Sequence, residues 1–172
     1  MVNYPDLKPG KGLQDYAGNR LDLQETFRFF IPGRYDILIT ELMVDPVPGV
    51  YLPECEYIEI YNALDDPVNT GDWEISAGVG QALLPPVTMD PGSYLIITST
   101  GCQGVYLGSQ ALFPSQSFLP NTGSTVILMN QTGDILDAVD YSSTLFQNTE
   151  KESGGWSVER TDPVNPCMGE VR

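Results

Sequence analysis

The chain has 172 residues, with 23 acidic and 8 basic side chains, no histidine and a formal net charge of −15. Nucleic acids and anionic membranes are bound through clustered lysine and arginine, so this charge balance disfavours both kinds of partner. Without histidine, the chain has no imidazole base for a catalytic triad and lacks the main ligand of catalytic zinc sites. Carboxylate chemistry, lysine chemistry or no chemistry remains. No apolar run is long enough to span a membrane.

Residues 1–34 differ from the rest because they hold five of the eight basic residues. A turn at Ala17-Gly18-Asn19, flanked by Asp15 and Leu21, precedes a predicted strand around Glu25–Ile31. This pattern resembles the closing strands of bacterial immunoglobulin-like repeats. We therefore expect residues 1–34 to be the terminal strands of a preceding domain, with an N-terminal extension of the main domain as the alternative. Both ends of the chain lack a closing feature, which suggests a piece of a longer protein.

From Tyr35 onward, short apolar or alternating runs follow one another, as expected for strands. In the first, Ile37 and Ile39 are expected to face the core. In Tyr57–Tyr61, Ile58 and Ile60 should face inward and Glu59 outward. The predicted strands are Ile37–Val44, Tyr57–Tyr61, Trp73–Ser76, Ala82–Val87, Ser93–Ser99, Thr125–Met129, Ile135–Tyr141 and Trp156–Arg160.

Turn signals separate these runs at regular intervals, including Asp45-Pro46, Asp90-Pro91-Gly92 and Asn121-Thr122-Gly123. No segment has a convincing helical pattern, and Gln103–Gln110 reads as a loop. Many short strands with regular punctuation indicate an all-β, antiparallel sandwich or barrel.

Several segments together resemble the lamin tail domain family in its bacterial form. They are ILITELMVDP, ECEYIEIYN, NTGDWEIS, LPPVTMDPGSYLIITS, NTGSTVILMNQTGDILDAVDYS and WSVERTDPVNPC. The resemblance implies an immunoglobulin-like antiparallel β-sandwich over residues 35–172. It also implies a module without catalytic residues, within a secreted or cell-surface multidomain bacterial protein. The expected location is therefore extracellular, and the partner is a protein, a glycan or another domain of the same parent chain.

The three cysteines are widely spaced, which disfavours a zinc site and permits at most one disulfide within the chain. Cys102 and Cys167 both lie in turn-like segments, whereas Cys55 precedes a strand. We expect a bond between Cys102 and Cys167, with Cys55 buried and free.

Acidic residues cluster near the proline-rich loop that follows the first strand. Asp45, Glu54 and Glu56 could supply oxygen ligands to Ca²⁺, although no EF-hand loop is present. Solvated surface charge is the simpler interpretation. A pair of carboxylates could also hydrolyse glycosides, but that reaction needs two acids flanking the bond in a cleft.

Aromatic residues offer a second set of candidates. Trp73 is expected in the core rather than on a ligand platform. The same position is expected for Trp156, with a partly open ring as the alternative because Ser153-Gly154-Gly155 precedes it. Phe113, Phe118 and Leu119 should cap one end of the sandwich, or form a patch for a partner. The predicted function is a non-catalytic interaction or spacer module. The alternatives are a carbohydrate- or Ca²⁺-dependent binding module and a carboxylate-based hydrolase.

Overall fold

The computed structural model describes residues 30–78, 80–145 and 151–162. The chain divides into two compact units, residues 1–30 and 31–172, and all described residues except Phe30 belong to the second. The predicted turn at Ala17-Gly18-Asn19 and most of the predicted strand Glu25–Ile31 lie outside the described residues, and the two residues of that strand which are described, Phe30 and Ile31, are not in a strand. Residue 32 already contacts the main domain, because Asn130 Nδ2 donates a hydrogen bond to the carbonyl of Pro32 at 3.0 Å.

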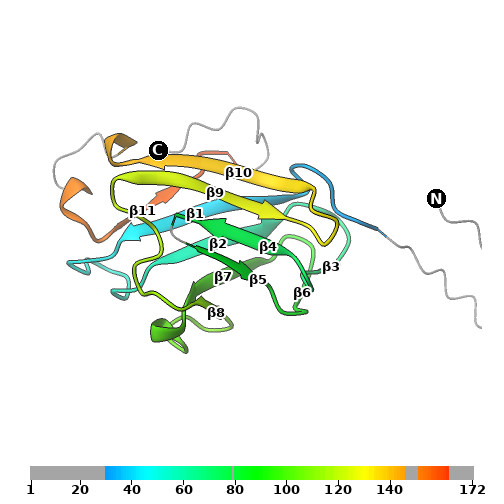
Figure 1. The fold of residues 1–172 in the computed structure, drawn as a ribbon, viewed down its shortest axis with the longest axis horizontal. Helices are drawn as coiled ribbons and strands as arrows, with labels where there is room; N and C mark the ends of the chain where they lie inside the picture. Colours follow the sequence, from blue (N-terminus) through cyan, green and yellow to red (C-terminus); the bar gives the residue numbers. More distant parts are fainter. Residues whose placement is uncertain (1–29, 79, 146–150, 163–172) are drawn as a thin grey trace, which may run out of the picture. The chain divides into compact units, whose positions relative to one another are not determined.

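The described domain is a sandwich of two sheets. In Figure 1 one sheet lies in front of the other. The front sheet has the strand order β10-β9-β4-β5, and the sheet behind it has the order β11-β1-β2-β7-β8. Two short strands, β3 and β6, pair separately. The strands are β1 (Ile37–Asp45), β2 (Tyr57–Asn62), β3 (Val68–Asn69), β4 (Glu74–Ala77), β5 (Gly80–Leu83), β6 (Thr88–Met89), β7 (Tyr94–Ser99), β8 (Gln110–Phe113), β9 (Gly123–Met129), β10 (Ile135–Ser142) and β11 (Trp156–Glu159).

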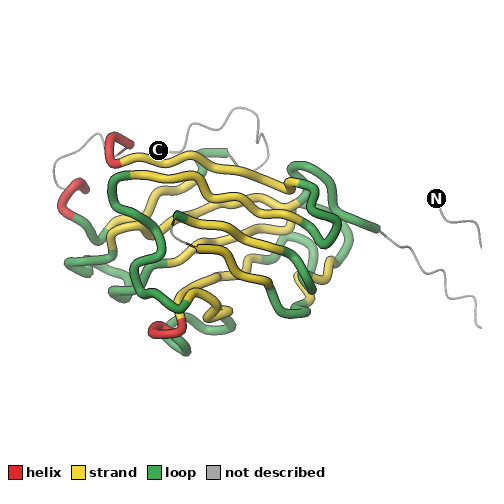
Figure 2. Tube along the Cα trace, viewed as in Figure 1, coloured by secondary structure: helices red, strands yellow, loops and turns green. Residues whose placement is uncertain are grey.

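The all-β, immunoglobulin-like prediction is confirmed, and most predicted strands match observed ones within a few residues. Three short strands were not predicted: β3, β6 and β8. The β8 strand begins at Gln110, where a loop was expected to end, and it pairs with β7 in parallel. Helical residues among those described form only short 3₁₀ turns, at Thr100–Cys102, Ser143–Leu145 and Lys151–Ser153, drawn red in Figure 2. No helix in the described ranges is long and apolar enough to cross a bilayer.

The core lies between the two sheets and is built from alternate strand residues, as the sequence pattern predicts. Ile58 and Ile60 of β2 are fully buried, and Trp73 is 1 % exposed, so its predicted core position is confirmed. Phe113 and Phe118 are also buried and stack on each other with ring centroids 4.2 Å apart. The capping interpretation of these phenylalanines is therefore correct.

Candidate binding groove

A β-bulge in β1 interrupts the regular alternation of this strand. Ile39 pairs with Ile60 and Glu41 pairs with Glu59, so Thr40 is the extra residue between two successive pairs. A bulge leaves backbone groups outside the ladder. At this bulge they are satisfied by side chains: the N–H of Ile39 donates to Asp137 Oδ2 at 2.8 Å, and Arg160 Nε donates to the Ile39 carbonyl at 3.0 Å.

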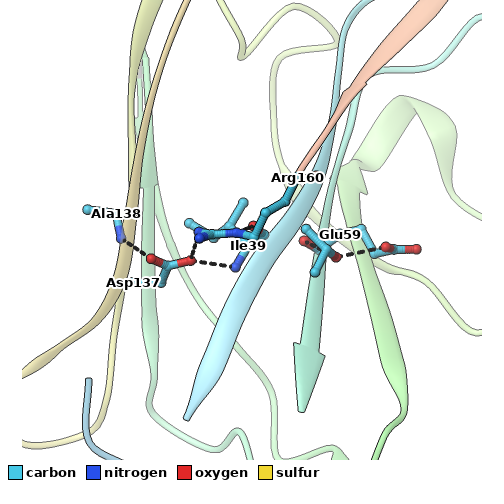
Figure 3. Close-up of polar contacts among 6 residues, drawn as sticks. Ile39, Glu59, Asp137, Ala138 and Arg160 are labelled. Atoms are coloured by element: carbon cyan, nitrogen blue, oxygen red, sulfur yellow. Dashed lines mark hydrogen bonds and ion pairs between the residues drawn. The ribbon is translucent and has the colours of Figure 1, made fainter. Parts of the chain in front are cut away.

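Asp137 and Arg160 connect the two sheets at this point (Figure 3). Asp137 belongs to β10 of one sheet, and Arg160 follows β11 of the other. Their side chains are 1 % and 5 % exposed, and Arg160 Nη2 lies 2.5 Å from Asp137 Oδ2. Burial raises the pKa of Asp137, an effect opposed by the N–H of Ile39 and by the Arg160 charge. This ion pair joins the two sheets at the place where β1 approaches β10.

The bulge determines which side chains of β1 face outward. Ile37 and Ile39 before the bulge, and Leu42 and Val44 after it, all belong to the core between the sheets. Strict alternation from Ile39 would direct Glu41 into that core. The extra residue shifts the phase by one, so Glu41 lies on the outer face of the sheet.

Glu41 lines a hollow of about 440 Å³ on the outer face of the five-stranded sheet. We call this hollow the acidic–aromatic groove, because three glutamates and four aromatic residues line it. Its floor comes from β11, β1, β2 and β7, and its rim comes from the β1–β2 and β7–β8 loops and from the start of β11. The lining residues are Glu41, Tyr51, Leu52, Tyr57, Glu59, Ile96, Tyr106, Gly155, Trp156, Ser157 and Glu159.

The three glutamates of the groove stand in one row across adjacent strands. Glu159 of β11 is directly opposite Glu41 of β1, and Glu41 is directly opposite Glu59 of β2. Glu41 accepts a hydrogen bond from the Tyr57 hydroxyl at 2.5 Å. Glu59 accepts one from the Thr40 hydroxyl at 2.8 Å, on the opposite side of β1 from Asp137 (Figure 3).

The charges in this row affect one another. Burial raises the pKa of Glu59 above its ordinary value, and the nearby carboxylates of Glu41 and Glu159 raise it further. The hydroxyl of Thr40 opposes this shift because it donates to the ionised carboxylate. Like charges directly opposite one another destabilise a sheet. The row therefore costs the fold stability.

Aromatic side chains form the walls of the groove. Tyr106 meets Tyr57 edge to face with ring centroids 5.1 Å apart, and its hydroxyl donates to the Cys55 carbonyl at 3.0 Å. Burial raises the pKa of Tyr106 to about 12, so this tyrosine is neutral at physiological pH. On the rim, Tyr51 is 87 % exposed and meets the half-buried Trp156 edge to face at 6.2 Å. The core position favoured for Trp156 was therefore wrong, and the alternative, a partly open ring, is confirmed.

The disulfide next to the groove corrects a sequence prediction. Cys102 is bonded to Cys55, with the Cα atoms 6.0 Å apart. The pairing of Cys102 with Cys167 and the free state of Cys55 were therefore wrong; Cys167 itself lies outside the described residues. The bond forms because β2 and β7 are neighbours, with Tyr57 opposite Thr98, which brings the two cysteines together just beyond the paired residues.

The predicted calcium ligands do not lie together as expected. Glu56 is 4 % exposed, and its Oε2 accepts hydrogen bonds from the N–H groups of Phe118 and Leu119 at 2.7 and 2.8 Å. Glu54 Oε1 accepts one from the N–H of Gly49 at 3.1 Å, and Asp45 lines a different hollow. The part of the chain that the structure describes has no group of three acidic or cysteine side chains arranged to hold a metal ion.

Sequence reasoning placed Glu59 on the outer face but did not identify Glu41, Glu159 or Tyr106 as parts of a site. Glu41 and Glu159 are 118 positions apart and become neighbours only through the pairing of β1 with β11. The available signal was the run Ile-Thr-Glu-Leu in β1, in which two polar residues interrupt an alternating pattern. Such an interruption marks a bulge.

Comparison with known proteins identifies one family. The family model described as Lamin Tail Domain matches residues 32–143. This range contains β1 to β10 and ends before β11, which contributes Trp156 and Glu159 to the groove. No curated protein matches the chain.

Proposed function

Because that match covers more than half of its residues, the chain belongs to the lamin tail domain family, and we propose that it is an interaction module of an exported, multidomain bacterial protein. The family is one of non-catalytic immunoglobulin-like domains, which is consistent with an interaction or spacer role. The observation that favours interaction is the acidic–aromatic groove. A passive spacer has no use for a row of opposed glutamates beside exposed aromatic rings.

A binding role fits the chemistry of the groove better than a catalytic one. Glu41, Glu59 and Glu159 rise from the same sheet face in adjacent strands. Hydrolysis of a glycoside needs two carboxyl groups on opposite sides of the scissile bond. The chain contains no histidine to act as a base. The net charge of −15 further argues against nucleic acid as the partner.

Export is supported by the disulfide between Cys55 and Cys102, because such bonds persist mainly in oxidising compartments. The bond joins the β1–β2 loop to the end of β7, and both neighbouring loops contribute to the rim of the groove. An oxidising location would therefore also keep the rim in place.

A crosslinking experiment tests the interaction role. The photoreactive amino acid p-benzoylphenylalanine is placed at Tyr51 on the rim, and in a matched variant at Leu83, which is 62 % exposed on β5 of the other sheet. Both proteins are irradiated with surface material of the source cells. We expect a discrete adduct at Tyr51 and none at Leu83. Equal labelling at both positions, or none at either, would contradict the interaction role and favour a spacer.

A glycan-binding module is the second candidate. It is favoured by the exposure of Tyr51 and by the position of Trp156 beside carboxylates, since sugar rings stack on aromatic side chains while their hydroxyls donate to acids. Saturable quenching of Trp156 emission by a neutral oligosaccharide would support it, and the absence of quenching would dismiss it.

A further inference from the structure

Within the described ranges, no cation pairs with the row of glutamates in the acidic–aromatic groove. Glu41 receives a tyrosine hydroxyl and Glu59 a threonine hydroxyl, but among the described residues none of the three glutamates forms an ion pair. Two of them are half-buried, which weakens screening by water. The row therefore combines mutual repulsion with partial desolvation.

The described cations of the chain do not pair with the three glutamates, although one of them, Lys151, contacts a ring that lines the groove. Arg160 pairs with Asp137 across the sheets. Lys151 Nζ lies 5.3 Å from the centre of the Trp156 ring, and Arg34 lies 4.9 Å from that of Tyr35. Sequences are expected to violate local rules mainly where function requires it. A row of like charges that no described cation neutralises is such a violation, and a cation from another molecule would relieve it.

The walls of the groove specify the kind of cation. A guanidinium group is planar, stacks on aromatic rings and carries five N–H donors, so it can bond two carboxylates at once. Trp156 and Tyr106 offer ring surfaces, and Glu41 and Glu59 offer neighbouring carboxylates. A single metal ion fits less well, because the described residues hold no cluster suited to one. A neutral sugar would leave the repulsion in place.

The two loops that contribute Tyr51, Leu52 and Tyr106 to the groove also carry other exposed apolar side chains. In the β1–β2 loop, Val50, Tyr51 and Leu52 are 41, 87 and 40 % exposed. In the β7–β8 loop, Val105 and Leu107, which flank Tyr106, are 42 and 104 % exposed. Exposed apolar side chains around a polar centre are typical of a docking site.

We propose that the acidic–aromatic groove binds a peptide segment of a partner protein through an arginine flanked by apolar residues. The guanidinium lies over the row formed by Glu159, Glu41 and Glu59, and the flanking residues contact the two apolar loops. This assignment rests on the proposed interaction function and adds the chemistry of the partner. Opposite charge speeds encounter and fixes the orientation of the segment.

The test uses Trp156 as a reporter, since the other tryptophan, Trp73, is 1 % exposed in the core. Two capped peptides are titrated into the full chain: Leu-Arg-Leu and Leu-citrulline-Leu, whose central side chains have nearly the same shape but differ in charge. We expect saturable changes in emission with the arginine peptide and at least about tenfold weaker binding of the citrulline peptide. A Trp156→Phe variant should lose the signal.

Matched variants locate the site. Glu159→Gln should weaken arginine-peptide binding by about three- to tenfold. Asp65→Asn changes the net charge equally at an exposed residue that does not line the groove, and should leave the affinity unchanged. Added salt should weaken binding because the contact is ionic.

Other outcomes of these titrations would overturn the assignment of an arginine-containing peptide to the groove. If both peptides bound equally well, the charge of the central side chain would not contribute to binding. If the Glu159→Gln and Asp65→Asn variants weakened binding equally, the attraction would be to the acidic surface in general. Quenching by a neutral oligosaccharide alone would favour a glycan. If neither peptide binds at about 5 mM while Tyr51 still gives its crosslink, the arginine assignment fails and the interaction function stands. If the crosslink is absent as well, both fail.

Discussion

Asp137 and Arg160 form a buried ion pair, with Nη2 2.5 Å from Oδ2, at the point where β1 bulges. The same two side chains occupy the backbone N–H and carbonyl of Ile39, which the bulge leaves outside the ladder. Because the bulge turns Glu41 toward the outer face, an interaction on the inside of the sandwich fixes the position of an acidic group on its outside. Thr40, the extra residue of the bulge, therefore connects the buried ion pair to the proposed binding groove.

Asp137→Asn should destabilise the domain strongly. The change removes the negative charge of Asp137 from beside the buried Arg160 guanidinium, and breaking a buried ion pair in this way typically costs about 3–5 kcal/mol. The free energy of unfolding, measured by urea denaturation, should fall by that amount. The exposed Asp65→Asn change serves as the control and should be nearly neutral. A loss below about 1 kcal/mol for Asp137→Asn would show that the pair does not stabilise the fold.

The row of glutamates predicts a specific dependence of stability on pH. The pKa of Glu59 is raised in the folded state, from an ordinary value of 4.5, so the folded chain keeps this proton at pH values where the unfolded chain has lost it. Protonation of Glu59 therefore favours the folded state at low pH. This contribution to the free energy of unfolding is lost as pH rises through the raised pKa.

Glu59→Gln removes this titration while keeping an oxygen that can accept from Thr40. The variant should therefore gain stability relative to the natural chain as pH rises from about 4.5 to 7. Urea denaturation at several pH values measures the difference. If the difference in free energy of unfolding between the two proteins were constant across this pH interval, the pKa of Glu59 would not be raised in the folded state.

Loss of the disulfide should weaken the domain. The bond joins residues 47 positions apart, and closing a loop of this size in the unfolded chain corresponds to about 2–4 kcal/mol of stability. We expect a double change, Cys55→Ser with Cys102→Ser, to lower the free energy of unfolding by that amount.

The pairing itself can be checked by mass spectrometry of unreduced peptides. A Cys167→Ser variant should retain a peptide pair linked through Cys55 and Cys102. A linkage that includes Cys167 in the natural chain would restore the pairing that the turn-like sequence segments suggested.

Calcium should have little effect on stability. The carboxylate of Glu56 is buried and accepts two backbone N–H groups, and the described residues contain no group of acidic side chains arranged to hold a metal ion. We expect the melting temperature in millimolar CaCl₂ to match that in the same concentration of MgCl₂. A rise specific to calcium would support the calcium site predicted from the sequence.

Local patterns predicted much of the fold. The alternation in Tyr57–Tyr61 gave the correct inward face for Ile58 and Ile60, because one-sided burial produces a period of two. β8 was missed because Gln110–Phe113 is only four residues long and follows a loop rich in glycine and serine. Its parallel pairing with β7 depends on the path of the chain, which local alternation does not contain.

The groove and the disulfide were harder to predict for one shared reason. Both depend on which strands become neighbours: β11 beside β1 for Glu159 and Glu41, and β2 beside β7 for Cys55 and Cys102. The turn-like surroundings of Cys102 and Cys167 gave no information on that order. Glu56 was expected to be a solvated charge, with a calcium ligand as the alternative, whereas two backbone donors from a distant loop allow it to be buried.

Amide chemical-shift mapping with the Leu-Arg-Leu peptide would show residue by residue where the peptide binds. We expect shifts concentrated in the three adjacent strands that carry Glu159, Glu41 and Glu59 and in the loops around Tyr51 and Tyr106, with no shifts in β9 or β5. Shifts centred on the other sheet, or spread evenly over acidic residues, would contradict binding in the groove.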